Sequence, residues 1–231
     1  MIYLYSGTPG SGKSLHVARD IYNRLNLNKK NPRVIANFTI NEKMIKGKKA
    51  QFIYKDNSEL TVDYLLKFSR ENHVAGKENQ TLVVVDECQV IWNAREWQNN
   101  GNRMEWIKFF TQHRHLGYNF IVIAQNDRMI DRQIRCLFEY QVEHRKMNNF
   151  KLGKLMPFPT FIAITRWYGV NEKLNVEFFT YRRKWGKFYD SYSTFDLENK
   201  LATLGRKEEG GKGVPSSSAQ QANSNVIKIA K

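Results

Sequence analysis

Long apolar runs and cysteines are both scarce in this sequence of 231 residues. The longest apolar runs, Leu82–Val85 and Phe120–Ala124, fall far short of the ~20 residues that a membrane-spanning helix needs, and the opening MIYLYSG lacks the charged region of a secretion signal. We therefore expect no transmembrane segment in this chain. The two cysteines, Cys88 and Cys136, have no CxxC partner, which argues against a disulfide framework or a zinc ribbon and indicates a reducing compartment.

Acidic residues are few beside the basic ones, 22 against 37, and the net charge is +15. The excess lies towards the two ends of the chain, because residues 71–135 hold eight residues of each sign. This balance implies an anionic partner such as nucleic acid, a nucleotide or a membrane surface, and ordinary solvated lysine surfaces are the alternative. Hydrophobic residues make up 41% of the chain, which is enough for a packed core and excludes a disordered or fibrous chain.

Predicted strands and helices alternate over the first 135 residues. The run Ile2–Ser6 is β-prone, and Lys13–Leu27 has apolar residues at helical spacing. Further strands are predicted at Val34–Phe38, Thr81–Glu87 and Tyr118–Ala124, and further helices after Thr61, at about Asn102–Leu116 and at about Asp127–Arg135. This alternation is typical of a doubly wound α/β fold with a mainly parallel sheet.

The pattern changes after Leu137. Strand-like runs separated by Gly and Pro turns follow at Glu139–His144, Thr160–Tyr168, Leu174–Tyr181 and Phe188–Phe195. We expect them to form an edge or antiparallel extension of the sheet, so that residues 1–195 make one domain with residues 136–195 as its β-rich extension. From Gly205 onward Gly, Ser, Gln, Asn and Lys dominate, and residues 205–231 are predicted to be a disordered polar tail.

A nucleotide-binding motif lies between the first strand and the first helix. It matches G-x-x-x-x-G-K-[ST] with the residues Gly7, Thr8, Pro9, Gly10, Ser11, Gly12, Lys13 and Ser14. Glycines at this place let backbone N–H groups and the helix N-terminus surround the phosphates. Lys13 is expected to reach the β- and γ-phosphates, and Ser14 is expected to supply a hydroxyl ligand to Mg²⁺.

Hydrolysis needs further groups, and polar residues at the ends of two predicted strands can supply them. Asp86 is expected on the Mg²⁺ side, and the adjacent Glu87 is expected to act as general base for the attacking water. Gln125, at the end of the next buried strand, is predicted to sense the γ-phosphate. The alternative for Gln125 is an amide that satisfies backbone groups.

Three arginines are candidates for an arginine finger supplied by a neighbouring subunit. Arg132 and Arg135 lie three residues apart on one predicted helix, and Arg114 lies at the end of another. Ordinary surface arginines are the alternative. Aromatic and basic residues also interleave near the C-terminal end, a pattern that can stack bases and bind phosphates but is more simply explained by packing; they are Trp167, Trp185, Tyr189 and Tyr192 with Arg182, Arg183, Lys184 and Lys187.

Three segments carry a resemblance to a known family: IYLYSGTPGSGKSLHVARDI, TLVVVDECQVIW and HRHLGYNFIVIAQNDRMIDRQIR. Over residues 1–195 the chain resembles the zonula occludens toxin (Zot) family, P-loop ATPases that include the filamentous-phage assembly protein. The resemblance implies an additional-strand core of the RecA/FtsK-like type, in which the strand before Gln125 is inserted between the P-loop strand and the Asp86 strand. It also implies hydrolysis of ATP in a homo-oligomeric ring.

The same resemblance implies a function in phage morphogenesis. The expected protein is a Mg²⁺-dependent ATP hydrolase, a motor that assembles, extrudes or packages phage DNA, expected to be single-stranded, with coat protein or a membrane partner in the host cytoplasm or at the cytoplasmic face of its inner membrane. Family members usually continue into a membrane helix, so this chain is either a short member with a separate membrane partner or lacks that part. The alternatives are a small-molecule kinase or nucleotide switch, and a non-hydrolysing nucleic-acid adaptor; Glu87 beside Asp86 favours the motor.

Overall fold

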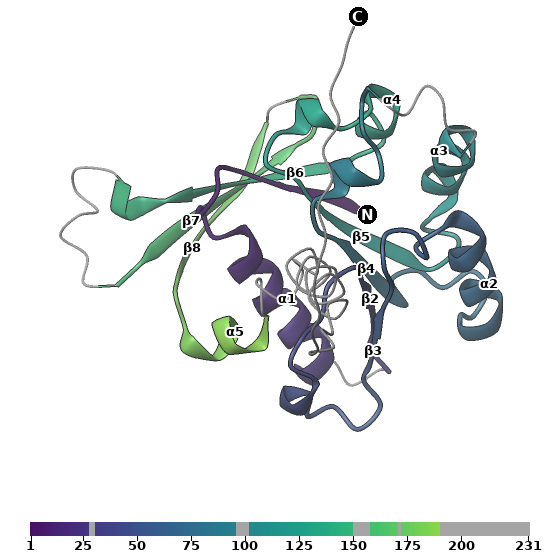
Figure 1. Ribbon diagram of the computed structural model, residues 1–231, viewed down its shortest axis with the longest axis horizontal. Coiled ribbons are helices and arrows are strands. Elements are labelled where there is room, and N and C mark those ends of the chain that lie inside the picture. Colours follow the sequence, from purple (N-terminus) through teal and green to yellow (C-terminus); the bar gives the residue numbers. More distant parts are fainter. Residues whose placement is uncertain (28–30, 96–101, 150–157, 171, 190–231) are drawn as a thin grey trace, which may run out of the picture. The chain divides into compact units, whose positions relative to one another are not determined.

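The computed structural model describes residues 1–27, 31–95, 102–149, 158–170 and 172–189. Its centre is an eight-stranded sheet with the order β3-β2-β4-β5-β1-β6-β7-β8 (Figure 1). The strands are β1 Ile2–Ser6, β2 Arg33–Ala36, β3 Gln51–Tyr54, β4 Thr81–Val85, β5 Tyr118–Ile123, β6 Tyr140–Lys146, β7 Thr160–Trp167 and β8 Lys173–Thr180. Among these described residues, no helix is both long and apolar enough to cross a membrane.

The six strands from β3 to β6 are parallel, and β5 lies between β1 and β4. The register shows this insertion directly, because Phe120 of β5 is opposite both Ile2 of β1 and Val83 of β4. The additional-strand topology implied by the family resemblance is therefore confirmed. The carboxyl ends of β1, β4 and β5 meet at one edge of the sheet, and parallel sheets bind ligands at that edge.

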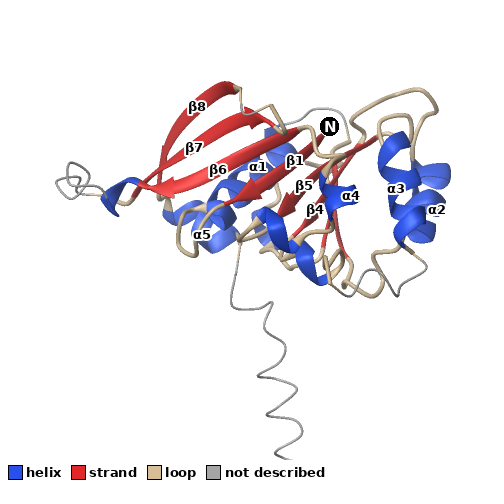
Figure 2. Cartoon of the chain, turned by 90° about the horizontal axis from the view of Figure 1, so that it is seen from above, coloured by secondary structure: helices blue, strands red, loops and turns tan. Residues whose placement is uncertain are grey.

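Helices cover both faces of the sheet because the strands are apolar on both sides. In β4, Leu82 and Val84 belong to one hydrophobic cluster and Val83 and Val85 to the other. The first cluster contains α1 Lys13–Leu27 and the end of α5 Arg183–Phe188; the second contains α2 Val62–Asn72, α3 Arg103–Gln112 and α4 Arg132–Arg135 (Figures 1 and 2). Short 3₁₀ turns occur at Glu42–Met44, Cys88–Val90, Asp127–Met129 and Met147–Asn149.

The C-terminal extension contains both parallel and antiparallel strand pairs. β6 runs parallel to β1, whereas β7 pairs antiparallel with β6 and β8 pairs antiparallel with β7, so the three strands lie side by side at one edge of the sheet (Figure 2). This confirms the predicted β-rich extension over its described part. The boundary expected near residue 195 and the polar tail predicted at residues 205–231 both fall outside the described residues.

Several predicted elements differ from the observed ones. The helix predicted at Asp127–Arg135 is broken in two, because Ile130 forms an isolated bridge with Asn93 and the Asp131 side chain accepts hydrogen bonds that cap α4. The helix predicted to reach Leu116 ends at Gln112. The short strand β3 was not predicted. The strand predicted at Phe188–Phe195 is wrong at its start, since Phe188 ends α5, and residues 190–195 lie outside the described ranges.

Candidate nucleotide site

The eight residues of the P-loop motif connect β1 to α1, as the sequence predicts. The amide of Ser11 donates to the Thr8 carbonyl at 3.1 Å, and the amide of His16 donates to the Gly12 carbonyl at 2.9 Å, which starts the helix. The Lys13 ammonium spans the loop and donates to the carbonyl of Gly7 at 2.7 Å and of Thr8 at 3.1 Å. The loop thus places a cation and the N-terminal amides of α1 together, an arrangement suited to phosphate.

Close packing explains why two of the motif positions are glycine. Gly12 has a φ of +99°, and a Cβ there would lie 2.7 Å from the ring of Phe161 on β7. Gly7 has a φ of +142°, and a Cβ there would lie 2.5 Å from the carbonyl oxygen of His144 on β6. Any other residue would clash at both places, so the extension packs directly against the loop.

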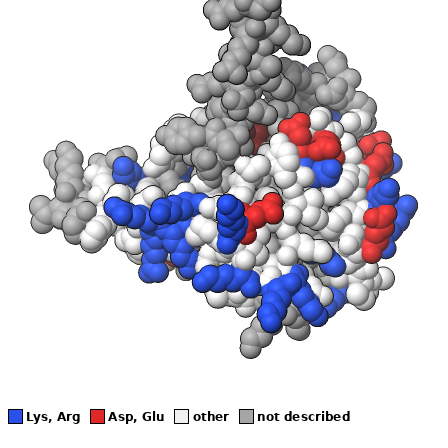
Figure 3. Space-filling view, turned by 60° about the horizontal axis from the view of Figure 1, so that its bottom comes forward, with Lys and Arg blue, Asp and Glu red and all other residues white. Residues whose placement is uncertain are grey.

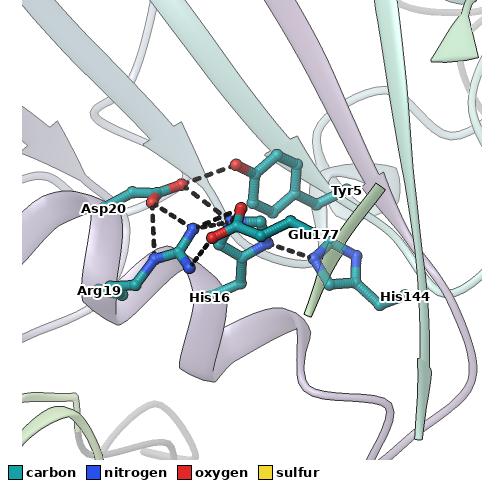
Figure 4. A network of polar contacts seen from close by, with 6 residues as sticks. All are labelled: Tyr5, His16, Arg19, Asp20, His144 and Glu177. Atoms are coloured by element: carbon teal, nitrogen blue, oxygen red, sulfur yellow. Dashed lines mark hydrogen bonds and ion pairs between the residues drawn. The ribbon is translucent and has the colours of Figure 1, made fainter. Parts of the chain in front are cut away.

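A chain of buried polar groups supports the start of the loop (Figure 4). His16 and His144 share a hydrogen bond of 2.8 Å, and the second ring nitrogen of His144 lies 3.2 Å from the Ser6 carbonyl oxygen. Because Arg19 donates to Nε2 of His16, the remaining protons are set: His16 Nδ1 donates to His144, and His144 Nδ1 donates to Ser6. Burial lowers the pKa of both histidines, that of His144 to about 3, so both are neutral.

Charged side chains from α1 and β8 complete this network. Arg19 donates to both oxygens of Glu177 on β8, with Nη2 3.0 Å from Oε2, and Tyr5 donates to Asp20 at 2.7 Å (Figure 4). The hydrogen bond from Arg19 lowers the pKa of Glu177. The network therefore ties β1, α1, β6 and β8 together beside the P-loop, and sequence reasoning missed it because its hydrogen-bonded pairs lie up to 158 residues apart.

Asp86 follows β4 and is held through both its backbone and its carboxylate. The Asn37 side chain accepts from the Asp86 amide at 2.7 Å and donates to the Asp86 carbonyl at 2.8 Å. One carboxylate oxygen accepts from the Glu87 amide at 2.8 Å, and the other accepts from the Tyr189 hydroxyl at 2.6 Å. Burial raises the pKa of Asp86, and these hydrogen bonds oppose that shift.

Glu87 and Lys13 lie in the same electrostatic neighbourhood as Asp86. Burial lowers the pKa of Lys13, and the negative charges of Asp86 and Glu87 oppose that shift. Glu87 is exposed and adopts a left-handed conformation with a φ of +46°, a strained state for a residue other than glycine. Its carboxylate accepts a hydrogen bond from Gln89. Asp86, with Glu87 next to it in the chain, is held by Tyr189, which lines the same cavity as the P-loop.

A cavity of about 580 Å³ adjoins the P-loop. One wall is the segment from Gly10 to Leu15. The other wall is aromatic and comes from the extension: Phe161, Tyr181, Trp185, Gly186 and Tyr189. Pockets of this size accommodate small-molecule ligands, and a wall of this composition presents apolar surface opposite the phosphate-binding amides. Trp167, Trp185, Tyr189 and Tyr192 were predicted as base-stacking or packing groups, and the structure places two of them, Trp185 and Tyr189, around this cavity.

The other predicted site residues, Gln125 and the three arginines, are not among the residues that line this cavity. Gln125 is exposed just beyond β5, between the ends of β1 and β4. Arg132 is exposed on α4, whereas Arg135 pairs with Asp127 at 3.5 Å. Arg114 pairs with Glu139, whose amide bonds to the Ile2 carbonyl at the opposite end of β1, so it is remote from the P-loop.

The residues present fit a nucleotide with Mg²⁺. Ser14 and Asp86 offer hard oxygen ligands, and the described part of the chain has no cluster of three His, Cys, Asp or Glu residues that would hold a metal alone. A site with few protein ligands suits Mg²⁺, which binds one or two protein oxygens together with phosphate oxygens and water. The buried Ser11 hydroxyl has no hydrogen-bond partner among the described residues, which leaves a polar group of the loop for a ligand.

This fold and this loop define a P-loop NTPase of the additional-strand type. The sequence profile of the family described as Zonular occludens toxin (Zot) matches residues 1–196, and the chain belongs to this family.

Relatives and solved structures agree with this assignment. The gene 1 protein of Escherichia phage If1 is 24% identical over 214 residues, which cover 85% of this chain but only 58% of that protein, so the chain spans less than two thirds of this relative's length. The N-terminal domain of zonular occludens toxin from Neisseria meningitidis matches with a TM-score of 0.50 and 22% identity, covering 82% of this chain and 98% of that domain. A second solved structure, described as an ATPase domain, matches with a TM-score of 0.55 and 12% identity, covering 82% of this chain and 84% of that domain. At these identities, the two solved structures support the fold.

Proposed function

We propose that this protein is a Mg²⁺-dependent ATPase motor that assembles, extrudes or packages phage DNA during phage morphogenesis. One observation carries the chemical part: the P-loop lines a cavity of about 580 Å³, and Tyr189 in its opposite wall holds Asp86 at 2.6 Å. Phosphate-binding amides, a lysine and a metal-binding carboxylate thus belong to a single site.

Each residue has a separate role in this proposal. Lys13 makes charge-assisted hydrogen bonds to the β- and γ-phosphates, and Ser14 and Asp86 hold Mg²⁺, which neutralises phosphate charge when it is bound. Glu87 accepts the proton of the attacking water. Gln125, beyond β5, senses the γ-phosphate.

A ring of identical subunits would bring an arginine to the site of a neighbour. Arg132 is the better candidate because it is exposed, whereas Arg135 is engaged by Asp127. An arginine supplied in trans stabilises the charge that develops on the transferred phosphate. This makes hydrolysis dependent on assembly.

The phage role rests on the family and on the gene 1 proteins that the chain is similar to. We propose that the protein works in the host cytoplasm, or peripherally at the cytoplasmic face of the inner membrane, together with coat protein or a membrane partner. The domain that performs the ATPase reaction is proposed to comprise residues 1–195.

DNA is the proposed polyanionic substrate, most simply single-stranded phage DNA. On the face that lies at the bottom of Figure 1 and comes forward in Figure 3, Lys and Arg side chains gather at the left and along the bottom, whereas most acidic side chains lie at the right and upper right. α5 lies on this side, and its basic residues are all exposed: Arg183, Lys184 and Lys187, with Arg182 directly before them. Such a surface binds phosphate backbones without reading base sequence.

The test is phosphate release from ATP, measured with Mg²⁺ and with EDTA, for the parent chain, for Lys13→Ala and for Lys67→Ala. Lys67 is an exposed lysine of α2 and serves as a matched control. The proposal expects Mg²⁺-dependent turnover in the parent and in Lys67→Ala, and none in Lys13→Ala. Transfer of phosphate to a small molecule instead of water would favour a kinase, and DNA binding without turnover would favour an adaptor.

A further inference from the structure

Tyr189, the residue that follows α5, contacts Asp86 although it lies outside the P-loop motif. The Tyr189 side chain is buried, and its hydroxyl donates to Oδ2 of Asp86 at 2.6 Å. Its ring packs edge-on against Phe38 with a centroid distance of 4.6 Å. The hydroxyl is therefore aimed at Asp86 by packing as well as by its hydrogen bond.

The backbone around Tyr189 is fixed to the segment that follows β2. The amide of Asn41 donates to the Phe188 carbonyl at 2.9 Å, and Tyr189 forms an antiparallel bridge with Ile40. Towards α5, the Tyr189 amide donates to the Trp185 carbonyl at 3.2 Å. A change at the Tyr189 hydroxyl is thus connected to the last turn of α5.

Both carboxylate oxygens of Asp86 already have donors within the protein. Oδ1 accepts from the Glu87 amide, and Oδ2 accepts from Tyr189. Each carboxylate oxygen has two lone pairs and accepts one hydrogen bond here, so a metal ion or a metal-bound water on Oδ2 would share that oxygen with the tyrosine hydroxyl or displace it. Ser14 and Tyr189 line the same cavity.

We propose that Tyr189 is a positioning residue that holds Asp86 while the site is free of metal and gives up this bond when Mg²⁺ arrives with the nucleotide. The tyrosine that would respond to the metal directly follows α5, which carries the exposed Arg183, Lys184 and Lys187. This inference rests on the proposed nucleotide function and adds to it a link between the metal site and the basic surface. No part of the P-loop motif encodes that link.

The first test is the effect of Mg²⁺ on nucleotide affinity in the parent, in Tyr189→Phe and in the control Tyr118→Phe. Phenylalanine keeps the ring against Phe38 and removes only the competing hydroxyl. We expect the ratio of affinity with Mg²⁺ to affinity with EDTA to rise about two- to tenfold in Tyr189→Phe, the size of one net hydrogen bond. Tyr118→Phe, at the start of β5, removes a tyrosine hydrogen bond of 2.7 Å to the Leu65 carbonyl oxygen, and it should leave this ratio unchanged. A merely structural role for Tyr189 would lower the ratio or leave it as it is.

The second test observes Tyr189 in the parent protein, and a variant is used only to assign its resonance. The chain has 11 tyrosines, and after labelling with 3-fluorotyrosine the ¹⁹F resonance missing from Tyr189→Phe identifies Tyr189. We expect this resonance to move when Mg²⁺ and ADP are added together and to stay in place when ADP is added with EDTA.

The outcomes separate the inference from the function on which it rests. If the parent binds no nucleotide, both are overturned. If the parent binds nucleotide with Mg²⁺ but neither the affinity ratio nor the Tyr189 resonance responds as described, the tyrosine switch alone is overturned.

Discussion

The two walls of the nucleotide cavity are built in different ways. The wall from Gly10 to Leu15 offers backbone amides at the start of α1, and its shape is set by glycines that tolerate positive φ. The opposite wall offers side chains, Phe161 from β7 and Tyr181 to Tyr189 from the segment around α5. A wall of backbone amides suits the phosphates that all nucleoside triphosphates share, whereas a wall of side chains from β7 and α5 joins the cavity to other parts of the molecule.

The change with the largest expected effect is at Arg132, which belongs to neither wall of the cavity. Arg132→Ala should bind ATP normally and hydrolyse it about 10³-fold more slowly, because an arginine supplied in trans stabilises transition-state charge. Adding Lys13→Ala subunits, which still offer their own Arg132, should restore part of the turnover measured as phosphate release. Failure of rescue at every mixing ratio would mean that each subunit works alone.

Glu87→Gln separates binding from chemistry on the motif side. The amide keeps the shape of the side chain but cannot accept a proton, so turnover should fall by about 10²–10⁴ while nucleotide affinity is retained. Nucleotide titration and phosphate release measure the two properties. Turnover equal to that of the parent would place the general base on another residue.

The motif wall was predictable from the sequence and the aromatic wall was not, for a physical reason. A P-loop is local: eight consecutive residues set the backbone, and the strand before Asp86 is recognisable because it is apolar on both faces. The alternation of strands and helices likewise predicted the parallel sheet. By contrast, the contact between Tyr189 and Asp86 joins residues 103 positions apart, and no spacing rule connects them.

Local patterns also failed where tertiary pairing decides. The periodicity of Asp127–Arg135 is helical, yet the bridge between Ile130 and Asn93 interrupts it. In the same way, Phe188 begins a run rich in aromatic residues, which favours a strand, whereas in the structure Phe188 packs against Tyr22 and ends α5. The roles of Gln125, Arg132 and Arg135 stay predictions.

The extension should contribute to the stability of the motif wall through His144. His144→Ala leaves Nδ1 of the buried His16 without an acceptor and opens space beneath Ser6, so we expect a loss of about 2–4 kcal/mol in the free energy of unfolding. Denaturant unfolding followed by tryptophan fluorescence measures it. If the free energy of unfolding of His144→Ala equals that of the parent, the extension does not stabilise the loop through His144.

The same histidines predict a pH dependence of stability. Their pKa values lie below the value near 6.5 of the unfolded chain, because burial keeps both rings neutral. Below about pH 6.5 the unfolded chain therefore binds more protons, and the free energy of unfolding falls by about 1.4 kcal/mol per pH unit for each histidine. Between about pH 6 and pH 4, His144→Gln should show a shallower decline than the parent. If the free energy of unfolding declines equally steeply in the parent and in His144→Gln, the assignment of neutral rings is contradicted.

The smallest expected effects concern the basic residues of the segment around α5. If Arg183, Lys184 and Lys187 contact single-stranded DNA, replacing each by Ala should lower the slope of log affinity against log salt by about 0.7. Binding titrations of a fluorescent oligonucleotide across salt concentrations measure this slope. Anionic vesicles serve as the comparison, and preference for vesicles would assign the charge to a membrane surface instead.

The central claim is that the P-loop and the extension form one nucleotide site. Photolabelling with 8-azido-ATP in the presence of Mg²⁺, followed by peptide mapping, tests it most directly, because the label reacts next to the base while the phosphates occupy the loop. We predict modification within Tyr181–Tyr189, at Phe161, or at both, competed by unmodified ATP and absent from Lys13→Ala. Modification confined to peptides outside this wall would contradict the claim.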